Sequence, residues 1–175
     1  RAGYRDFLAA HEWGFLRPRA NFTLWPTVTG TATAGLTTTV TATTAVFFPS
    51  MIGHSIVFTA GSTYTITGYT SSTVITVNST AAADSSKAFT ITADGVYRMP
   101  DDYGSMYSTK IYFAAGSNDD RVIQLTSESV VVSALQSNAD PSRPTMAGVR
   151  PLLNDGTGQR FDLVSYPIAD QNYPT

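Results

Sequence analysis

Residues 55–80 read SIVFTAGSTYTITGYTSSTVITVNST, and this stretch decides the expected fold. Apolar positions alternate with polar ones in short runs: Ile56 and Phe58, Tyr64 and Ile66, Ile75 and Val77, and later Phe89 and Ile91. Clusters such as AGST, GYTSS and VNST bound these runs, and β-branched Thr and Val favour extended chain. The stretch therefore predicts short antiparallel strands with one apolar face and one face covered by threonine.

The same composition extends over residues 20–93, where Asp84 and Lys87 are the only charged residues apart from histidine. We expect a small antiparallel β module of about five short strands, given the usual strand length of about 5–6 residues. The piece from Thr27 to Thr44 is unusually rich in Thr and Ala. The longer piece TVTGTATAGLTTTVTATTAVFFPS, residues 27–50, is predicted to be either a hairpin arm or a poorly packed strand pair without the usual charged protection of its edges.

The segments on either side, 1–19 and 94–175, carry most of the charge and have a different pattern. Near the start, apolar residues at helical spacing predict a helix, and Trp13 and Phe15 are interpreted as core residues. Later, SNDDRVIQLTSESVVVSALQSN predicts a strand around Val122 to Leu125 and a short helix. The N-cap of that helix is expected at Thr126 or Ser127 and its end at Asn138 and Pro141. PTMAGVRPLL and QRFDLVSYPIA predict two strands joined by the turn NDGTG.

Together these patterns predict an α+β protein that is predominantly β. Its body, residues 1–19 and 94–175, combines a small helical part with an antiparallel sheet, and the Thr-rich β module, 20–93, is inserted into it. The chain opens at Arg1 within a helical pattern and closes on SYPIADQNYPT, so we expect the full protein to extend beyond both ends.

The overall composition excludes several classes of protein. Hydrophobic residues make up 42%, which excludes disorder for most of the chain, while charged residues make up only 14%. A net charge of −2 does not support capture of nucleic acid through a basic patch. The absence of cysteine excludes disulfide scaffolds, thiolate zinc sites and cysteine nucleophiles. No apolar run approaches the roughly 20 residues of a membrane-spanning helix.

The stretch VYRMPDDYG, residues 96–104, raises the question of an acidic site. Neighbouring side chains on extended chain point to opposite sides, so Asp101 and Asp102 do not converge on one metal or one proton. Proline followed by Asp and then Gly is typical of a turn. We therefore interpret the stretch as a structural hinge where the module rejoins the body. Its residues are Tyr97, Met99, Pro100, Asp101, Asp102 and Gly104.

Other candidates for chemistry are weak. SNDDR at 117–121 and DGTG at 155–158 lack the ligand spacing of an EF-hand, and no nucleophile elbow, zincin, P-loop or dinucleotide motif occurs. His11 beside Glu12 is interpreted as a packed or capped residue. We predict no catalytic, metal or cofactor site. Tyr64 and Tyr69 leave open a carbohydrate-binding β module that stacks sugars on aromatic rings.

The order of the motifs carries a resemblance. FLAAHEWGFLRP resembles the N-terminal helix region of head–tail connector (adaptor) proteins of short-tailed bacteriophages. FFPSMIGHSIVFTAGSTYTITGYTSSTVITVNST looks like a β module of phage virion proteins, and DGVYRMPDDYG is similar to the step out of it. IQLTSESVVVSAL then resembles the following strand and helix, and GVRPLL with GQRFDLVSYPIADQNYP the closing strand pair. Two departures are the Thr- and Ala-rich stretch 27–44 and the absence of the elements expected after Tyr173.

The resemblance implies a structural virion protein at the head–tail interface, assembled in the host cytoplasm, with no catalytic turnover. It implies a homo-oligomeric ring, expected to be a 12-mer, that binds the portal protein and a tail nozzle or tail tube protein. DNA would pass through the channel without specific binding, and no membrane is involved. The alternatives are another phage virion component, such as a tail, fibre or decoration protein, and a carbohydrate-binding adhesive β module.

Overall fold

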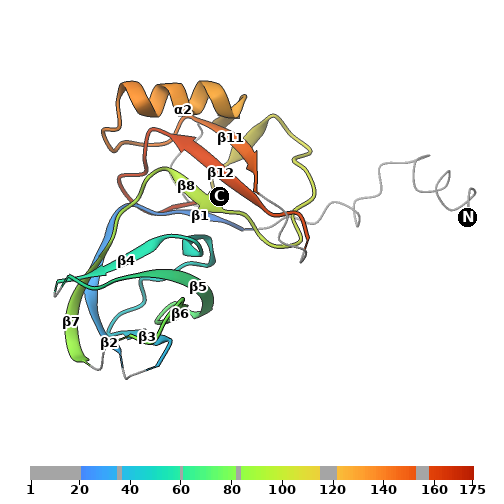
Figure 1. Cartoon of the computed structure of the whole chain (residues 1–175). Coiled ribbons are helices and arrows are strands. Elements are labelled where there is room, and N and C mark those ends of the chain that lie inside the picture. The colour runs from blue at the N-terminus through green and yellow to red at the C-terminus, as the bar shows by residue number, and fades with distance from the viewer. Residues whose placement is uncertain (1–20, 35–36, 60, 82–83, 115–121, 153–157) are drawn as a thin grey trace, which may run out of the picture.

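A computed structural model gives the fold of the chain. It consists of a β-barrel and a body in which one helix covers a sheet (Figure 1). The architecture is thus α+β and predominantly β, which confirms the fold class expected from the sequence. The structure describes residues 21–34, 37–59, 61–81, 84–114, 122–152 and 158–175. The predicted N-terminal helix with Trp13, Phe15 and His11, the SNDDR loop and most of the NDGTG turn lie outside these ranges.

The barrel is a closed sheet of six antiparallel strands in the order β2-β3-β6-β5-β4-β7. Closure leaves none of these strands at an open edge. A module with so few charged residues therefore needs no charged side chains to protect unpaired backbone groups. A 3-10 turn, η2 (Pro49–Met51), precedes β4. The strands are β2 (Val28–Ala34), β3 (Thr39–Ala42), β4 (Ser55–Phe58), β5 (Thr63–Ser71), β6 (Val74–Val77) and β7 (Asp84–Ile91).

Alternation along these strands fills the barrel, because every second side chain points inward. The side chains buried there include Val40, Ile56, Phe58, Ile66, Ile75, Val77, Phe89 and Ile91. The barrel has six strands where the sequence predicted about five. The stretch 27–44 forms two of the six, β2 and β3, whose inward residues Ala32, Val40 and Ala42 are all buried. Of the two alternatives for this piece, the antiparallel pairing of β2 with β3 agrees with the hairpin, and the poorly packed strand pair is wrong because its inward side chains are buried.

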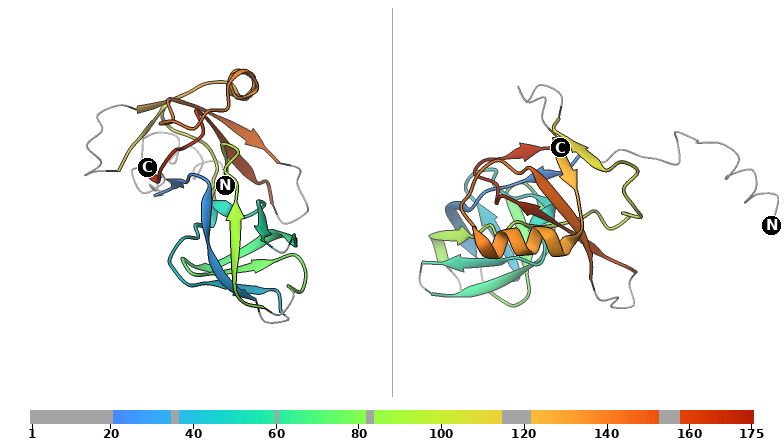
Figure 2. Two further views of the ribbon diagram at one scale, coloured as in Figure 1. Left: turned by 90° about the vertical axis from the view of Figure 1, so that its left-hand side faces the viewer. Right: turned by 90° about the horizontal axis from the view of Figure 1, so that it is seen from above.

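The body sheet has five strands in the order β8-β12-β11-β10-β9. Every pairing is antiparallel except β10 with β11, which are parallel because the chain between them crosses over through helix α2 (Glu128–Ser137). Figures 1 and 2 show α2 on the side of this sheet away from the barrel. The strands are β8 (Val96–Arg98), β9 (Lys110–Tyr112), β10 (Val122–Leu125), β11 (Met146–Pro151) and β12 (Phe161–Tyr166).

Helix α2 lies close against the sheet. Val131 of α2 is fully buried, and Gly148 of β11 faces the first turn of the helix. A Cβ at Gly148 would stand 2.8 Å from the backbone Cα of Glu128, so only glycine permits this approach. Ser127 occupies the N-cap position, although its side chain makes no capping hydrogen bond, and Asn138 ends the helix. Among the described residues, no helix combines the length and apolar character needed to span a bilayer.

The two ends of the described chain meet in a short ribbon, β1 (Thr23–Leu24) paired with β13 (Tyr173–Pro174). All six barrel strands lie in the sequence between β1 and β8. The chain therefore leaves for the barrel through Trp25 to Thr27 and returns through Thr92 to Gly95. This arrangement places two short connections and the turn before β4 at the junction of barrel and body.

Candidate functional site

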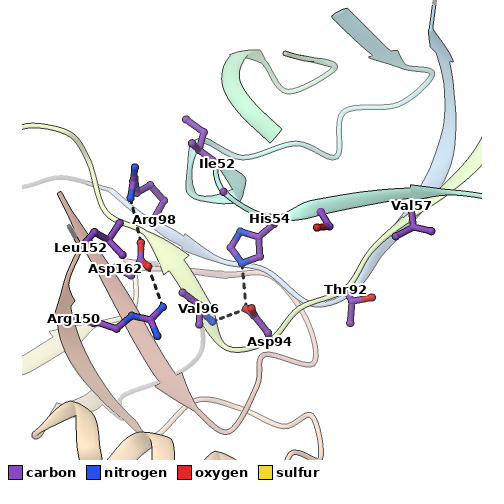
Figure 3. A pocket seen from close by; sticks show the side chains of 12 residues that line it. Ile52, His54, Val57, Thr92, Asp94, Val96, Arg98, Arg150, Leu152 and Asp162 are labelled. Atoms are coloured by element: carbon purple, nitrogen blue, oxygen red, sulfur yellow. Dashed lines mark hydrogen bonds and ion pairs between the residues drawn. The ribbon is translucent and has the colours of Figure 1, made fainter. Parts of the chain in front are cut away.

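A cavity of about 540 Å³ lies where the barrel meets the body sheet (Figure 3). Its lining comes from the η2–β4 turn and β4 on the barrel side, and from the return segment, β8, β11 and β12 on the body side. Two charged groups of residues face it. One is the ion pair network of Arg98, Arg150 and Asp162, and the other is the contact between His54 and Asp94.

The register of the body sheet creates the ion pair network. Asp162 of β12 is the cross-strand partner of Arg98 on β8 and also of Arg150 on β11. Its Oδ2 accepts a hydrogen bond from Nη2 of Arg150 at 3.1 Å, and its Oδ1 lies 3.6 Å from Nη1 of Arg98. Asp162 is only 8% exposed. A buried carboxylate needs such partners, because isolated charge is costly to remove from water.

Arg150 extends the network to the helix. Its Nε lies 3.8 Å from Oε1 of Glu128, the first residue of α2. An acid in the first turn also suits the positive end of the helix dipole. The contacts of Arg98, Arg150, Asp162 and Glu128 connect three strands with the helix. The formal charges of these four residues sum to zero. The network does not leave a surplus positive charge for an anion.

His54 joins the barrel to the return segment. Its Nε2 lies 3.2 Å from Oδ1 of Asp94, and its Nδ1 lies 3.2 Å from the carbonyl oxygen of Met51. Oδ1 of Asp94 also accepts the backbone N–H of Val96 at 2.9 Å, which fixes the start of β8. Burial alone would raise the pKa of Asp94, but the hydrogen bonds from His54 and Val96 outweigh it and hold the pKa below its usual value. Asp94 is therefore a carboxylate at neutral pH.

Two aromatic rings pack next to the His54–Asp94 contact. The Trp25 ring meets the His54 ring edge-on at 4.8 Å and the Tyr97 ring edge-on at 5.5 Å. The Tyr97 hydroxyl donates to the carbonyl oxygen of Trp25 at 3.1 Å. Burial raises the pKa of Tyr97 well above the ordinary value, so this phenol stays protonated and keeps its donor. Trp25 on the outgoing connection and Tyr97 on β8 thus tie the two chain crossings to one another.

Comparisons with protein families, with curated protein sequences and with solved structures found no match.

The chemical capacity of the cavity follows from its residues. Among the residues described by the structure, no three or more His, Cys, Asp or Glu side chains come together in a way that could hold a metal ion. The cationic and anionic side chains lie in mutual contacts, and each contact crosses between elements. The cavity is best described as a polar joint between barrel and body.

The hinge residues predicted from VYRMPDDYG lie next to this joint. The side chains of Tyr97 and Met99 are buried in the core. Pro100 opens a turn in which its carbonyl oxygen accepts the N–H of Tyr103 at 3.0 Å. Asp101 and Asp102 occupy the middle of that turn and are exposed, and Asp101 forms an ion pair with Arg160. Gly104 follows with open space around it.

The tyrosines considered for sugar stacking have another environment. Tyr64 and Tyr69 are half-buried and pack against the barrel core, and the Tyr64 ring also meets Phe58 edge-on at 6.0 Å.

Sequence reasoning did not find the joint. Arg98 lies within the quoted hinge stretch, but its partner Asp162 is 64 residues away in the chain, since the two numbers differ by that amount. Alternation along FDLVSY gave no signal, because Phe161 and Leu163 place Asp162 on the opposite face, and only the structure shows that β12 is buried on both faces. His54 and Asp94 gave no signal, because both lie in connections rather than in periodic elements.

Proposed function

We propose that this chain is a structural virion protein of a tailed bacteriophage, a ring-forming adaptor between portal and tail that works without catalytic turnover. One observation carries the proposal. The motifs from FLAAHEWGFLRP to GQRFDLVSYPIADQNYP follow one another in the order that resembles head–tail connector proteins of short-tailed phages.

The fold supports the proposal because the motifs coincide with structural units. The module motif beginning at FFPS covers η2 and strands β4 to β6, and DGVYRMPDDYG covers the return into the body, β8 and the turn after it. IQLTSESVVVSAL covers most of β10 and α2, and the two closing motifs pair as β11 and β12. The first motif lies outside the described residues. Each motif within the described residues therefore corresponds to consecutive strands, turns or the helix of the fold.

The chemistry of the joint also favours a structural role. Its ionisable side chains connect strands, helix and connections, and they offer no converging nucleophile and base. In the proposed ring, each subunit buries apolar surface against its neighbours and the portal. A weakly charged channel wall lets DNA pass without binding, and repeated interfaces provide the affinity.

Two exposed tyrosines offer a surface for such contacts. Tyr107 and Tyr112 are 70% and 61% exposed, and Tyr112 belongs to β9, one of the two edge strands of the body sheet. Aromatic side chains are enriched at protein interfaces and depleted from surfaces that stay in water. We place the contact with a ring neighbour or with the portal at this edge.

Electron microscopy of the purified protein and of its parent particle tests the proposal. The expected result is a closed ring, located at the capsid vertex in the particle. Twelve copies of the 18.7 kDa chain would weigh about 224 kDa in mass photometry, if the ring has the expected twelvefold symmetry. Mixing with a portal protein should give a joint complex.

Paired variants sharpen the test. Replacing Tyr107 and Tyr112 with Ser should weaken ring formation, whereas replacing Asp101 and Asp102 with Asn, also on an exposed turn, should leave it largely intact. A chain that stays monomeric and binds glycans on an array would contradict the adaptor function and favour the adhesive module. A particle with the protein along its tail or fibre would favour another virion component.

A further inference from the structure

Helix α2 covers only part of one face of the body sheet. It packs against β11 and β12, and Gly148 of β11 faces its first turn. Met146 lies on the same face as Gly148, because the two are two residues apart on one strand. Gln124 of β10 is the partner of Met146, and Lys110 of β9 is the partner of Gln124. The face that α2 covers therefore continues over β10 and β9.

Over β9 and β10 this face is exposed and partly apolar. Tyr112 of β9 is 61% exposed, and its cross-strand partner Val122 is half-buried. Lys110 and Gln124, on the same two strands, are exposed as well. These four side chains make up what we call the β9–β10 face. An exposed apolar surface beside polar side chains is typical of a contact with another protein segment.

Residues 1–20 have the composition of a segment that covers such a face. This segment precedes the described residues and carries six large apolar side chains: Tyr4, Phe7, Leu8, Trp13, Phe15 and Leu16. The first three have the i, i+3, i+4 spacing of one face of a helix. Apolar surface of this extent is costly to leave in water, so the segment requires a partner surface.

Net charge also favours contact between this segment and the rest of another copy. Residues 1–20 contain four arginines and two acidic residues, a formal charge of +2. Residues 21–175 contain seven Lys and Arg and eleven Asp and Glu, a formal charge of −4. Opposite net charges attract the segment to the remainder of a chain before any specific contact forms. Within the β9–β10 face the charged residue is Lys110, and Asp6 and Glu12 of the segment are the acids that suit it.

The described chain begins on the opposite side of the sheet. Phe22 meets the ring of Tyr97 edge-on at 6.2 Å. Tyr97 alternates with Arg98 along β8, so the two side chains point to different faces. Arg98 pairs with Asp162, and the ion pair network of these residues reaches Glu128 of α2. Arg98 therefore lies on the α2 side, and Tyr97 with Phe22 lies on the other.

To reach the β9–β10 face, residues 1–20 of the same copy would have to pass around an edge of the sheet. The segment of a neighbouring copy has no such detour. We propose that residues 1–20 of each copy bind the β9–β10 face of the next copy, beside α2. This docking rests on the proposed ring function and names the partner of the β9 edge. A contact between two different surfaces repeats from copy to copy, which is how a closed ring forms.

Crosslinking in the full chain tests this contact. Because the chain has no cysteine, Ala9→Cys in the segment and Gln124→Cys on the β9–β10 face provide two unique thiols. A flexible bis-maleimide reagent should join the double variant into a ladder of dimers and larger products on denaturing gels. The matched control, Ala9→Cys with Thr41→Cys on the exposed barrel surface, should give no ladder. Absence of crosslinks, crosslinks confined to single chains, or an equal ladder in the control would overturn the proposal.

Ring formation in mass photometry separates this docking from the proposed function. Tyr112→Ser, and Phe7→Ser combined with Leu8→Ser, should each raise the concentration for half-assembly by about tenfold or more, because each removes apolar contact from one side of the same interface. Thr41→Ala should leave assembly unchanged, and circular dichroism checks that every variant folds. If the unchanged chain forms no ring, the proposed function and this docking both fail. If it forms rings that the serine variants leave intact, only this docking fails.

Discussion

Replacing Asp162 with Asn tests the ion pair network at the joint. Asn has nearly the same shape as Asp, so the packing of β12 is retained while the negative charge is lost. The side chain is 11% exposed and contacts arginines on the strands at both sides. The change therefore leaves two cations facing each other across a neutral amide.

The expected cost follows from the burial of the network. Removing one partner of a fully buried ion pair costs about 3–5 kcal/mol, and a hydrogen bond to a charged group contributes about 1.5–3 kcal/mol. The side chains of Arg98 and Arg150 are 23% and 35% exposed, so water compensates part of the loss. We expect Asp162→Asn to lower the free energy of unfolding by about 2–3 kcal/mol, a large part of the roughly 5–15 kcal/mol typical of domains.

Urea unfolding followed by far-ultraviolet circular dichroism measures this change. The matched control is Asp101→Asn, which also removes a carboxylate paired with an arginine, Arg160. The Asp101 side chain is 73% exposed, so the control should cost less than about 1 kcal/mol. Equal losses for the two variants, or a loss below about 1 kcal/mol for Asp162→Asn, would refute the view that the buried network stabilises the body sheet.

Three further variants test separate features. Gly148→Ala places a Cβ against helix backbone and should destabilise the fold by about 1–3 kcal/mol, whereas Gly104→Ala, with open space around it, should not; thermal melts compare them. Tyr97→Phe removes the hydrogen bond to the Trp25 carbonyl and should cost about 0.5–1.5 kcal/mol in urea, unless that bond is absent in solution. The pKa of Asp94 is lowered in the fold, so its contribution is present above the unfolded value of about 3.9 and lost as pH falls through the folded value. Asp94→Asn should therefore flatten the loss of the urea midpoint below about pH 4, and an unchanged acid slope would contradict this.

Local patterns predicted much of the secondary structure. The strand at Val122 to Leu125 and the end of the following helix at Asn138 agree with the structure, because strand alternation and helix capping are properties of neighbouring residues. The alternating pairs around Ile56 and Ile75 likewise lie on barrel strands. Barrel closure was not predictable from the pattern, since it depends on how β2 pairs with β7 across the module.

The joint depends on contacts that no local pattern encodes. Asp162 meets two arginines because β12 lies between β8 and β11, and this strand order is a property of the whole sheet. His54 and Asp94 meet although 40 residues separate them. The stretch 96–104 forms β8 and the turn after it, and no local pattern in the sequence indicates the charged partners that surround it.

The pairing of β2 with β7 has a consequence for how such a protein can evolve. Val28, where the barrel begins, is the cross-strand partner of Ile91, where it ends. Paired residues on antiparallel strands lie about 5 Å apart, so a single short loop could replace the entire barrel between β1 and β8. Lineages could therefore gain, lose or exchange the barrel at this position while the strand order of the body stays the same.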